Sequence, residues 1–460
     1  MPVRALKALV SKAPAPLLEA ARVAYDFLPP GVRYGKDYRE ALRFLDAAAS
    51  WDREAVTAFQ EERLRAMVRH CAANVPYYRS LFRTEDIGAD DVKTLADLKK
   101  LPFLTRSVVR ARAKDLIAEN IPAGAGIPSH TSGTTGSPLD FFWTKAVFGM
   151  DRALARRHLI ELGYEQGDRI AALRGELFAD PTRRYRYFPG SKQMIFSLRA
   201  VDDAGLAEIV DALEKFRPQF IRAFPSTLYI VAKWMERNRR LIHPPKYLVT
   251  SSETLFPHQR ELAEGVFEAP VADWYGHNEG TIAAGQCRYV KHYHVRFELG
   301  ILELEPGDSG DNEIVGTTLN NMVMPLLRYR TGDVGIPASD PCPCGTEHPL
   351  LAGISGRVGD MIITPERRII SSSVIDYCFY HLPEIKEGRI VQEDLYNVAV
   401  EVVPWEHISE ETKTRLLGEI EGHLQSRQMK VEYREVDLIP TTSGGKRPIV
   451  VSKVKAEDFL

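Results

Sequence analysis

Short apolar segments alternate with segments of helical periodicity between residues 168 and 275, and this alternation constrains the fold more than any other feature of the chain. The apolar segments predict strands at 169–173, 219–224, 247–250 and 271–274, and the periodic ones predict helices at 203–216 and 226–237. Strands separated by helices form parallel sheets with helices on their faces. We therefore expect an α/β fold with mostly parallel sheets flanked by helices, and ligands at the carboxyl ends of the strands.

The pattern changes toward the C-terminus. Strands are predicted at 298–305 and 313–319, followed by a hairpin at 389–403, a helix at 409–426 and a strand at 431–438. A chain of 460 residues is about three times the length of a typical domain. We expect a large N-terminal domain over residues 1–356 and a small α+β domain over residues 357–460.

Composition excludes several classes of protein. Lys plus Arg number 60 and Asp plus Glu 62, and this balance argues against a nucleic-acid binder, which needs a basic excess. No segment reaches the about 18 apolar residues that span a bilayer, so we expect no transmembrane segment. The five cysteines are too few and too unevenly spaced for a disulfide framework. We therefore expect reduced thiols and a cytoplasmic location.

The segment HTSGTTGSP at 130–138 contains only Gly, Ser and Thr between positions 131 and 137. Glycine allows backbone N–H groups to converge on an anion, and Ser and Thr hydroxyls add donors for phosphate oxygens. The segment is not a Walker loop, because no Gly-Lys-Ser/Thr follows. It predicts a phosphate-binding loop, and the alternative is a flexible surface turn.

Three further motifs carry charged side chains. Glu279 lies in YGHNEG after the strand 271–274, where a carboxylate could hold Mg²⁺, although a surface glutamate is the alternative. Asp333 ends YRTGD, and an ionised carboxylate can accept hydrogen bonds from two ribose hydroxyls, although it could also be an ordinary turn residue. Lys446 lies in PTTSGGK, where it could neutralise a phosphate or remain a solvated loop lysine.

The order of the motifs is more specific than any one of them. In sequence they are TSGTTGSP, YGHNEG, YRTGD, SGRVGD and PTTSGGK, and this ordered set resembles the adenylate-forming superfamily of acyl-CoA synthetases and peptide-synthetase adenylation domains. The segments AANVPYYRSLF, LPFLTRS and PCPCG resemble the phenylacetate–CoA ligase branch, and within it the capsular-polysaccharide-type members. The resemblance runs from about Tyr34 to Val454.

The resemblance implies roles for individual residues. The residues that would hold the ATP phosphates, with Thr134 as a catalytic contact, are Thr131, Ser132, Gly133, Thr134, Thr135 and Gly136. The residues that would bind the rest of the nucleotide are Ser252 and Glu253 at adenine and the acyl end, Tyr275 beside adenine, Asp333 at the ribose and Arg357. Glu279 would be the catalytic Mg²⁺ ligand, and Lys446 the catalytic adenylation lysine of a mobile C-terminal domain.

Two positions depart from the family pattern. The family often has Arg-x-Asp at the pivot between its domains, whereas this chain has Gly359 at the Asp position and Asp360 after it. Glycine still permits a hinge, but a specific Asp interaction there is put in doubt. The phosphate loop ends Ser137-Pro138, where many members carry a Lys or Arg.

The implied reaction joins a small carboxylic acid to AMP from ATP with release of pyrophosphate and then transfers the acyl group to coenzyme A. One alternative passes it to a sugar amine, a hydroxyl or a carrier-protein thiol. Another is a non-catalytic nucleotide-binding or zinc-stabilised scaffold. The acid cannot be identified, since its pocket is spread over about 174–300, and a homodimer stays open.

Cys287, Cys342 and Cys344, with His294 or its neighbour His292, could form a structural Zn²⁺ site. Three ordinary reduced thiols are the alternative. Two arginine groups are also conspicuous, and each could meet an anionic cofactor or substrate or simply face water. They are Arg152, Arg156 and Arg157, and Arg183, Arg184 and Arg186.

Overall fold

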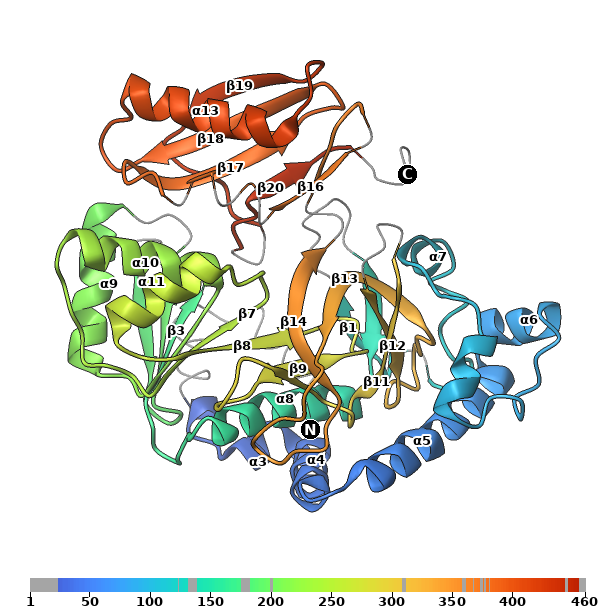
Figure 1. Ribbon diagram of the computed structural model, residues 1–460. Helices are drawn as coiled ribbons and strands as arrows, with labels where there is room; N and C mark the ends of the chain where they lie inside the picture. The colour runs from blue at the N-terminus through green and yellow to red at the C-terminus, as the bar shows by residue number, and fades with distance from the viewer. Residues whose placement is uncertain are drawn as a thin grey trace.

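The structure is a computed structural model that describes residues 24–122, 124–130, 139–174, 183–198, 202–307, 312–357, 361–366, 368–372, 375, 378–379, 381–442 and 446–454. A large unit carries a twelve-stranded sheet, and a smaller C-terminal unit with a four-stranded sheet lies above it in Figure 1. No helix in these ranges is long and apolar enough to cross a bilayer.

One half of the large sheet contains the predicted parallel strands, in the order β5-β3-β6-β7-β8. Their bounds are β3 Ile170–Arg174, β5 Gln193–Ser197, β6 Phe220–Ala223, β7 Tyr247–Ser251 and β8 Val271–Gly276. The strand β4, Tyr185–Phe188, pairs antiparallel with β5 at the sheet edge. The alternation of the sequence therefore predicted β3, β6, β7 and β8 but not β4 and β5 at the edge of the sheet.

The other half is antiparallel, a larger share than the sequence pattern indicated. Its order from β8 outward is β9 Ala283–Gln286, β10 Tyr293–Val295, β14 Leu350–Arg357, β13 Tyr329–Pro337, β12 Asn312–Thr318 and β11 Gly300–Pro306. Only a few residues connect β8 to β9, β9 to β10, and β11 to β12. A parallel crossover needs about a dozen residues or more, so these strands pair as hairpins.

Helices cover both faces of the parallel strands (Figure 1). One face packs against α9 Asp203–Phe216, α10 Pro225–Arg237 and α11 Pro257–Phe267 in one apolar cluster. The opposite face packs against the end of α8, Lys145–Glu161, where Leu159 meets Phe220 and Val249. Gly149 of α8 lies close to the backbone of α4, Gly35–Ala48. A side chain at Gly149 would clash, so the two helices need this glycine to approach each other.

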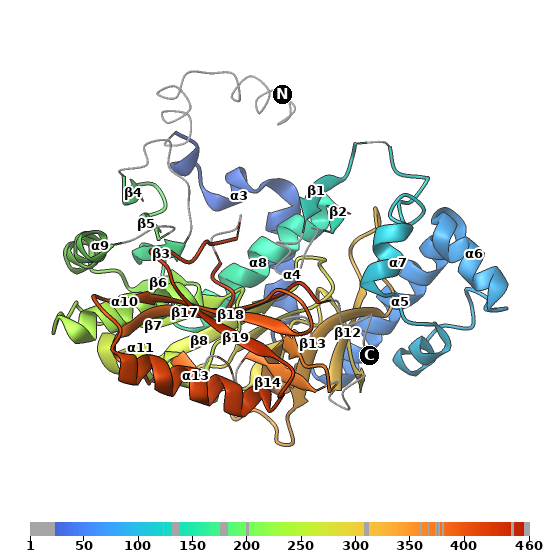
Figure 2. The ribbon, with the colours of Figure 1, turned by 90° about the horizontal axis from the view of Figure 1, so that it is seen from above.

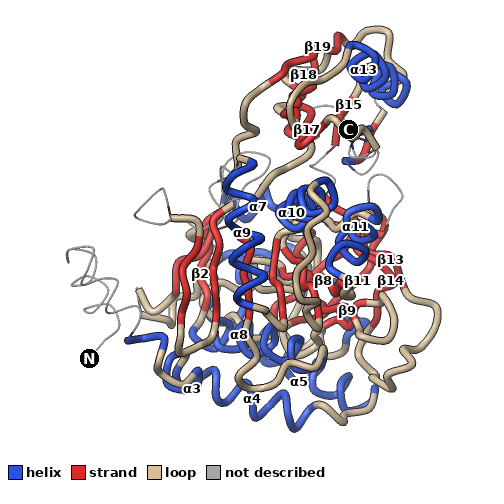
Figure 3. Tube along the Cα trace, turned by 90° about the vertical axis from the view of Figure 1, so that its left-hand side faces the viewer, coloured by secondary structure: helices blue, strands red, loops and turns tan. Residues whose placement is uncertain are grey.

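The remaining N-terminal elements pack beside the antiparallel strands, and Figure 3 shows α3, α4 and α5 on the side of the large unit away from the C-terminal unit. They are α3 Pro30–Arg33, α5 Arg53–Asn74, α6 Pro76–Thr84, the 3₁₀ helix Leu95–Lys100, α7 Arg106–Ala111, β1 Ile127–His130 and β2 Asp140–Trp143. The helix α5 begins after its N-cap Asp52, whose side chain accepts from the N–H of Ala55, and ends before Pro76.

The C-terminal unit has its own apolar core, which draws on residues from Ile362 to Val450. Its sheet has the order β19-β18-β17-β20, with the bounds β17 Ile385–Gln392, β18 Asn397–Pro404, β19 Lys430–Glu435 and β20 Val450–Ser452. The helix α13, Glu410–Leu424, begins after its N-cap Ser409, and a small hairpin joins β15 Met361–Ile363 to β16 Ile369–Ser371. The predicted boundary at 356/357 stays a prediction, because 358–360 lie outside the described residues.

Candidate active site

The segment 131–138, with the six predicted phosphate-binding residues and Thr134 among them, lies outside the described residues. The two strands that it connects, β1 and β2, form an antiparallel hairpin in which His130 is opposite Asp140. Trp143 at the end of β2 donates from Nε1 to the carbonyl of Asn278, at 3.0 Å. The base of the predicted phosphate loop is therefore attached to the loop that follows β8.

Glu279 lies in that loop and is only 1% exposed, so it is not the surface glutamate of the alternative interpretation. Its Oε1 accepts from the hydroxyl of Tyr329 at 3.4 Å and lies 3.9 Å from the Arg106 guanidinium. Its Oε2 lies 3.1 Å from Nε2 of His277, whose Nδ1 contacts the hydroxyl of Thr281 at 2.7 Å. A buried carboxylate held by such neighbours has a fixed position, as a metal ligand requires.

Asp333 and Tyr275 meet across the site. The Tyr275 hydroxyl donates to Oδ2 of Asp333 at 2.7 Å, which joins the end of β8 to β13. Gly332 has a φ of +77°, which favours glycine, and the Asp333 N–H then donates to the hydroxyl of Thr331 at 3.0 Å. Arg357, the predicted nucleotide contact, is opposite Asp333 in the β13–β14 register.

Ser252 and Glu253 follow β7, the strand beside β8. Ser252 adopts a φ of +75°, which turns the chain sharply at the strand end. Glu253 accepts from the N–H of Ser226 in the first turn of α10 and from the N–H of Arg447, both at 3.0 Å. Burial raises the pKa of Glu253, while these two donors and Lys446 oppose the increase. Ser252, Glu253 and Lys446 line one cavity of about 130 Å³ between the two units.

Arg447 is a site residue that the sequence analysis did not identify. Its Nη2 donates to the carbonyl of Leu198 in the large unit, and its Nε donates to Glu387 of β17 at 2.9 Å. Lys233 of α10 strengthens the same interface by donating to the carbonyl of Ile385 at 2.7 Å. The cationic pair Lys446-Arg447 was the available signal, but the sequence alone could not indicate which of the two docks on the large unit.

The predicted site residues thus form two neighbouring groups. Two tyrosine–carboxylate hydrogen bonds, Tyr275–Asp333 and Tyr329–Glu279, connect β8 and its loop to β13. The group with Ser252, Glu253 and Lys446 lies at the end of the adjacent strand β7. Both groups follow the carboxyl ends of parallel strands, where an α/β sheet is expected to bind its ligand.

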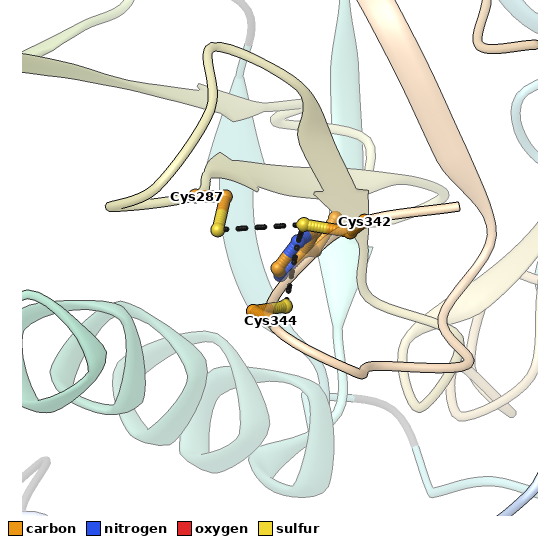
Figure 4. A group of neighbouring side chains, drawn as sticks. Cys287, Cys342 and Cys344 are labelled. Atoms are coloured by element: carbon orange, nitrogen blue, oxygen red, sulfur yellow. Dashed lines mark hydrogen bonds between the residues drawn. The ribbon is translucent and has the colours of Figure 1, made fainter. Parts of the chain in front are cut away.

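A separate cluster contains Cys287, Cys342, Cys344 and His294, and their potential ligand atoms all lie within 4.8 Å of one another. Figure 4 shows the three thiols pointing toward a common centre. The Sγ atoms of Cys287 and Cys342 are 3.5 Å apart, and Nε2 of His294 is 3.3 Å from Sγ of Cys342. Of the two histidines considered, His294 is the one in this cluster.

The chemistry of this donor set fits Zn²⁺, which prefers four sulfur and nitrogen ligands in tetrahedral arrangement. Burial lowers the pKa of His294 to about 4, so its imidazole is neutral and able to ligate at pH 7. Burial raises the pKa of Cys342 to about 12, so this thiol keeps its proton unless a cation displaces it.

Comparisons with known proteins find sequences similar to this chain. Residues 362–453 match the family model of the CapK C-terminal domain. The chain is 26% identical over 450 residues to the phenylacetate–coenzyme A ligase of Aromatoleum evansii, covering 87% of this chain and 95% of that relative. It is 24% identical to the phenylacetate–coenzyme A ligase of Thermus thermophilus, covering 85% of this chain and 92% of that relative.

The fold is shared with solved acyl-CoA ligases. The crystal structure of 2-hydroxyisobutyryl-CoA ligase in the postadenylation state aligns with a TM-score of 0.66 at 20% identity, covering 90% of this chain and 92% of that chain. The resemblance predicted from the motif order is confirmed. The chain is a homologue of the phenylacetate–coenzyme A ligases, with the fold of the adenylate-forming acyl-CoA ligases and a CapK-type C-terminal domain.

Proposed function

We propose that this protein is an ATP-dependent, AMP-forming acid–thiol ligase. It activates a carboxylic acid as an acyl-adenylate, releases pyrophosphate and transfers the acyl group to coenzyme A. The observation that carries this proposal is the pair of hydrogen bonds Tyr275–Asp333 and Tyr329–Glu279, which join β8 and its loop to β13. The adjacent strand β7 ends at the cavity lined by Glu253 and Lys446. The names of the sequence relatives support the same reaction.

The side chains have complementary tasks in the first half-reaction. A free carboxylate acylates poorly because its leaving group would be oxide, and attack on the α-phosphate of ATP makes AMP the leaving group instead. Asp333 would accept hydrogen bonds from the ribose hydroxyls, and Tyr275 would lie beside adenine. Glu279 would hold Mg²⁺, which neutralises phosphate charge when bound. Lys446 would offset the negative charge that develops as pyrophosphate departs.

The second half-reaction requires Lys446 to move away so that the thiol can reach the acyl carbon. In the present arrangement Arg447 connects the lysine loop to the large unit through Leu198 and Glu253. Release of these contacts would let the C-terminal unit rotate about residues 357–360, with Gly359 absorbing the backbone change.

We also propose that Cys287, His294, Cys342 and Cys344 hold one structural Zn²⁺. Four protein ligands leave no open coordination position, so the metal would stabilise the fold and take no part in the reaction. The cluster is close to the Arg296–Glu161 ion pair, which joins β10 to the end of α8. Since all five cysteines are free thiols, we place the enzyme in the cytoplasm.

A second candidate function keeps the adenylation and changes the acceptor to a sugar amine, a hydroxyl or a carrier-protein thiol. The match of residues 362–453 to the CapK C-terminal domain favours it, because the C-terminal unit would contribute to the acceptor side of the site if it rotates as proposed above. The first half-reaction alone does not fix the acceptor.

The test is a screen of carboxylic acids with ATP, with and without coenzyme A, read by mass spectrometry and by pyrophosphate exchange. The proposed reaction yields AMP, pyrophosphate and an acyl-CoA. Formation of AMP with no acyl-CoA product supports the second candidate. ATP binding without turnover of any acid, or hydrolysis to ADP, contradicts both and supports a scaffold.

A further inference from the structure

The cavity between the two units, which Glu253 and Lys446 line, continues along α10, and this part of it has no role in the function proposed above. Ser226 of α10 lies beside Glu253, to which its N–H donates. Lys233 follows seven residues later, about 10 Å further along the helix axis. The α10 residues that line the cavity are Ser226, Tyr229, Ile230 and Lys233. Their spacing of three and four places them on one face of the helix, so this face forms a continuous wall.

The C-terminal unit closes the cavity. Its apolar contributions are Phe379, Ile385, Ile439 and Ile449. The strand β17, which begins at Ile385, lies above α10 in Figure 1, and Lys233 of α10 donates to the carbonyl of Ile385 at 2.7 Å. Because the lining comes from both units, the cavity is enclosed only while the C-terminal unit is docked.

Two apolar side chains at the cavity, one from each unit, are buried outside the apolar cores. Ile439 of the C-terminal unit is 2% exposed, and Phe256 at the start of α11 is 8% exposed. Neither side chain is part of the apolar cores that the described residues of its unit form. A concave surface lined by such side chains is typical of a site for the apolar part of a small molecule.

The charged groups at the cavity already have partners. The Nε of Arg447 donates to Glu387 at 2.9 Å, and both side chains are buried. The ammonium of Lys386 lies over the ring of Trp405, 5.4 Å from its centroid. A charge on the body of a bound acid would lose its hydration here and would have to compete with these pairs. The cavity therefore favours an uncharged ligand body.

The cavity is separate from the residues assigned to the ribose and to Mg²⁺. Tyr275, Asp333 and Glu279 belong to β8, β13 and the loop after β8, and none of the three lines it. The strand β7, which leads to Glu253, lies between β8 and β6, and β6 leads into α10. Glu253 is therefore at the boundary between the nucleotide side of the site and the α10 side, where the reacting carboxylate would lie.

We propose that the body of the acid occupies this cavity and that the C-terminal unit supplies one wall of its pocket through Phe379, Ile439 and Ile449. The substrate class is a monocarboxylic acid with an uncharged, apolar body. The inference rests on the proposed function and adds to it. The acid pocket, which the sequence analysis placed within about 174–300, thereby extends into the C-terminal unit. Because this wall leaves when the unit rotates, the acid is selected during adenylation and not during thioester formation.

The experiment measures kcat/KM in acid-dependent pyrophosphate exchange for straight-chain acids from butanoate to decanoate, phenylacetate, 3-phenylpropanoate and para-carboxyphenylacetate. The wild type should use phenylacetate at least about 10-fold better than its para-carboxy derivative. Ile439→Ala should lower use of the preferred acid by about 10-fold and move the preference to longer acids, and Ile439→Phe should move it to shorter ones. The KM for ATP should stay at the wild-type value in both variants, and exchange with the newly preferred acids shows that they are folded.

The matched control is Leu438→Ala. This neighbouring side chain is 45% exposed and does not line the cavity, so the order of the acids should not change. Thioester formation from synthetic adenylates of the same acids should follow one order in the wild type and in both Ile439 variants, because the wall is absent in that step.

Three results would overturn the inference and leave the ligase function intact. They are an unchanged order of acids in both Ile439 variants, a preference of the wild type for the dicarboxylate, and a raised KM for ATP without a change in the order of acids. The last result would assign the cavity to the nucleotide. Absence of exchange with every acid in the wild type removes the proposed function and the inference with it.

Discussion

At the scale of single residues, the site depends on polar side chains with fixed positions. Glu279 is almost fully buried between Tyr329, His277 and Arg106, and Asp333 is held by Tyr275. Lys446 differs, because it enters the site from the C-terminal unit. Its contribution should therefore be confined to the half-reaction in which that unit is docked.

Replacing Lys446 by Ala should lower acid-dependent pyrophosphate exchange by about 100- to 1,000-fold, the loss expected for one preorganised group that stabilises developing charge. Thioester formation from a synthetic acyl-adenylate should continue, since that step does not use the lysine. Lys430→Ala, at an exposed position on β19, is the control and should exchange normally. Unchanged exchange in Lys446→Ala would remove this lysine from the mechanism.

At the scale of secondary-structure elements, the polar groups beneath the sheet join segments that are distant in sequence. The Cys/His cluster connects β9 and β10 to the loop before β14. The ring of His158 in α8 packs against that of Trp274 in β8, tilted by 38° with the centroids 5.1 Å apart, and the Arg296–Glu161 pair lies beside it. The parallel and antiparallel halves of the sheet are therefore connected through α8.

The metal prediction belongs to this scale. Purified protein should contain one Zn²⁺ per chain, and removal by a chelator should lower the melting temperature by several degrees, because a structural metal contributes folding free energy. Cys287→Ser should lose the metal, whereas Cys378→Ser, in the C-terminal core, should retain it. Metal content is measured by elemental analysis, and equal zinc in both variants would contradict the assignment.

Acid sensitivity follows from the same region. Burial lowers the pKa of His158 and of His348 to about 3, below the ordinary value of 6.5. The unfolded chain therefore takes up these protons first as the pH falls, and stability is lost below about pH 6.5. Each of these two histidines should lower the free energy of unfolding by about 2 kcal/mol at pH 5 relative to pH 7. His158→Gln should lose less stability than the wild type between these pH values in urea denaturation, and an equal loss would contradict the prediction.

At the scale of the whole molecule, hydrogen bonds and an ion pair join the C-terminal unit to the large unit. Seen from above in Figure 2, it lies over the large sheet. Arg447, Glu253 and Lys233 make polar contacts between the two units near the cavity, and Arg237 of α10 pairs with Glu406. Polar contacts of this kind suit a unit that would detach in each cycle of the proposed reaction.

Arg447→Met should weaken this docking. We expect pyrophosphate exchange to fall by about 10- to 100-fold, because a charged hydrogen bond to Leu198 is lost, while thioester formation from a synthetic acyl-adenylate stays near wild type. Arg434→Met is the matched control, since Arg434 pairs with Glu432 and Glu393, both within the C-terminal unit. Equal loss in both half-reactions would indicate a general folding defect and contradict the docking role.

The sequence predicted those features that short segments determine. The strands β3, β6, β7 and β8 and the helices α9 and α10 were recovered because period and length suffice to identify them, whereas β4, β5 and α11 were not predicted. The motif order predicted the similarity to the phenylacetate–coenzyme A ligases. In the antiparallel half the sequence predicted β11 and β12 but not β9, β10, β13 and β14, where pairings such as that of β10 with β14 join segments far apart in the chain. Nor did it predict that Glu279 is buried or that Ile439 and Phe256 line one cavity, since these arrangements form only when distant segments are side by side.

The strand β14 has a consequence for how the two units communicate. It begins after the loop that carries Cys342 and Cys344, and it ends at Arg357, opposite Asp333. Asp333, which we assign to the ribose of the nucleotide, is therefore paired in the sheet with Arg357, the last residue of β14. A nucleotide bound to Asp333 should restrict motion of the backbone at Arg357, where the proposed rotation of the C-terminal unit begins. The enzyme without nucleotide should therefore sample more orientations of that unit than the enzyme that holds an adenylate.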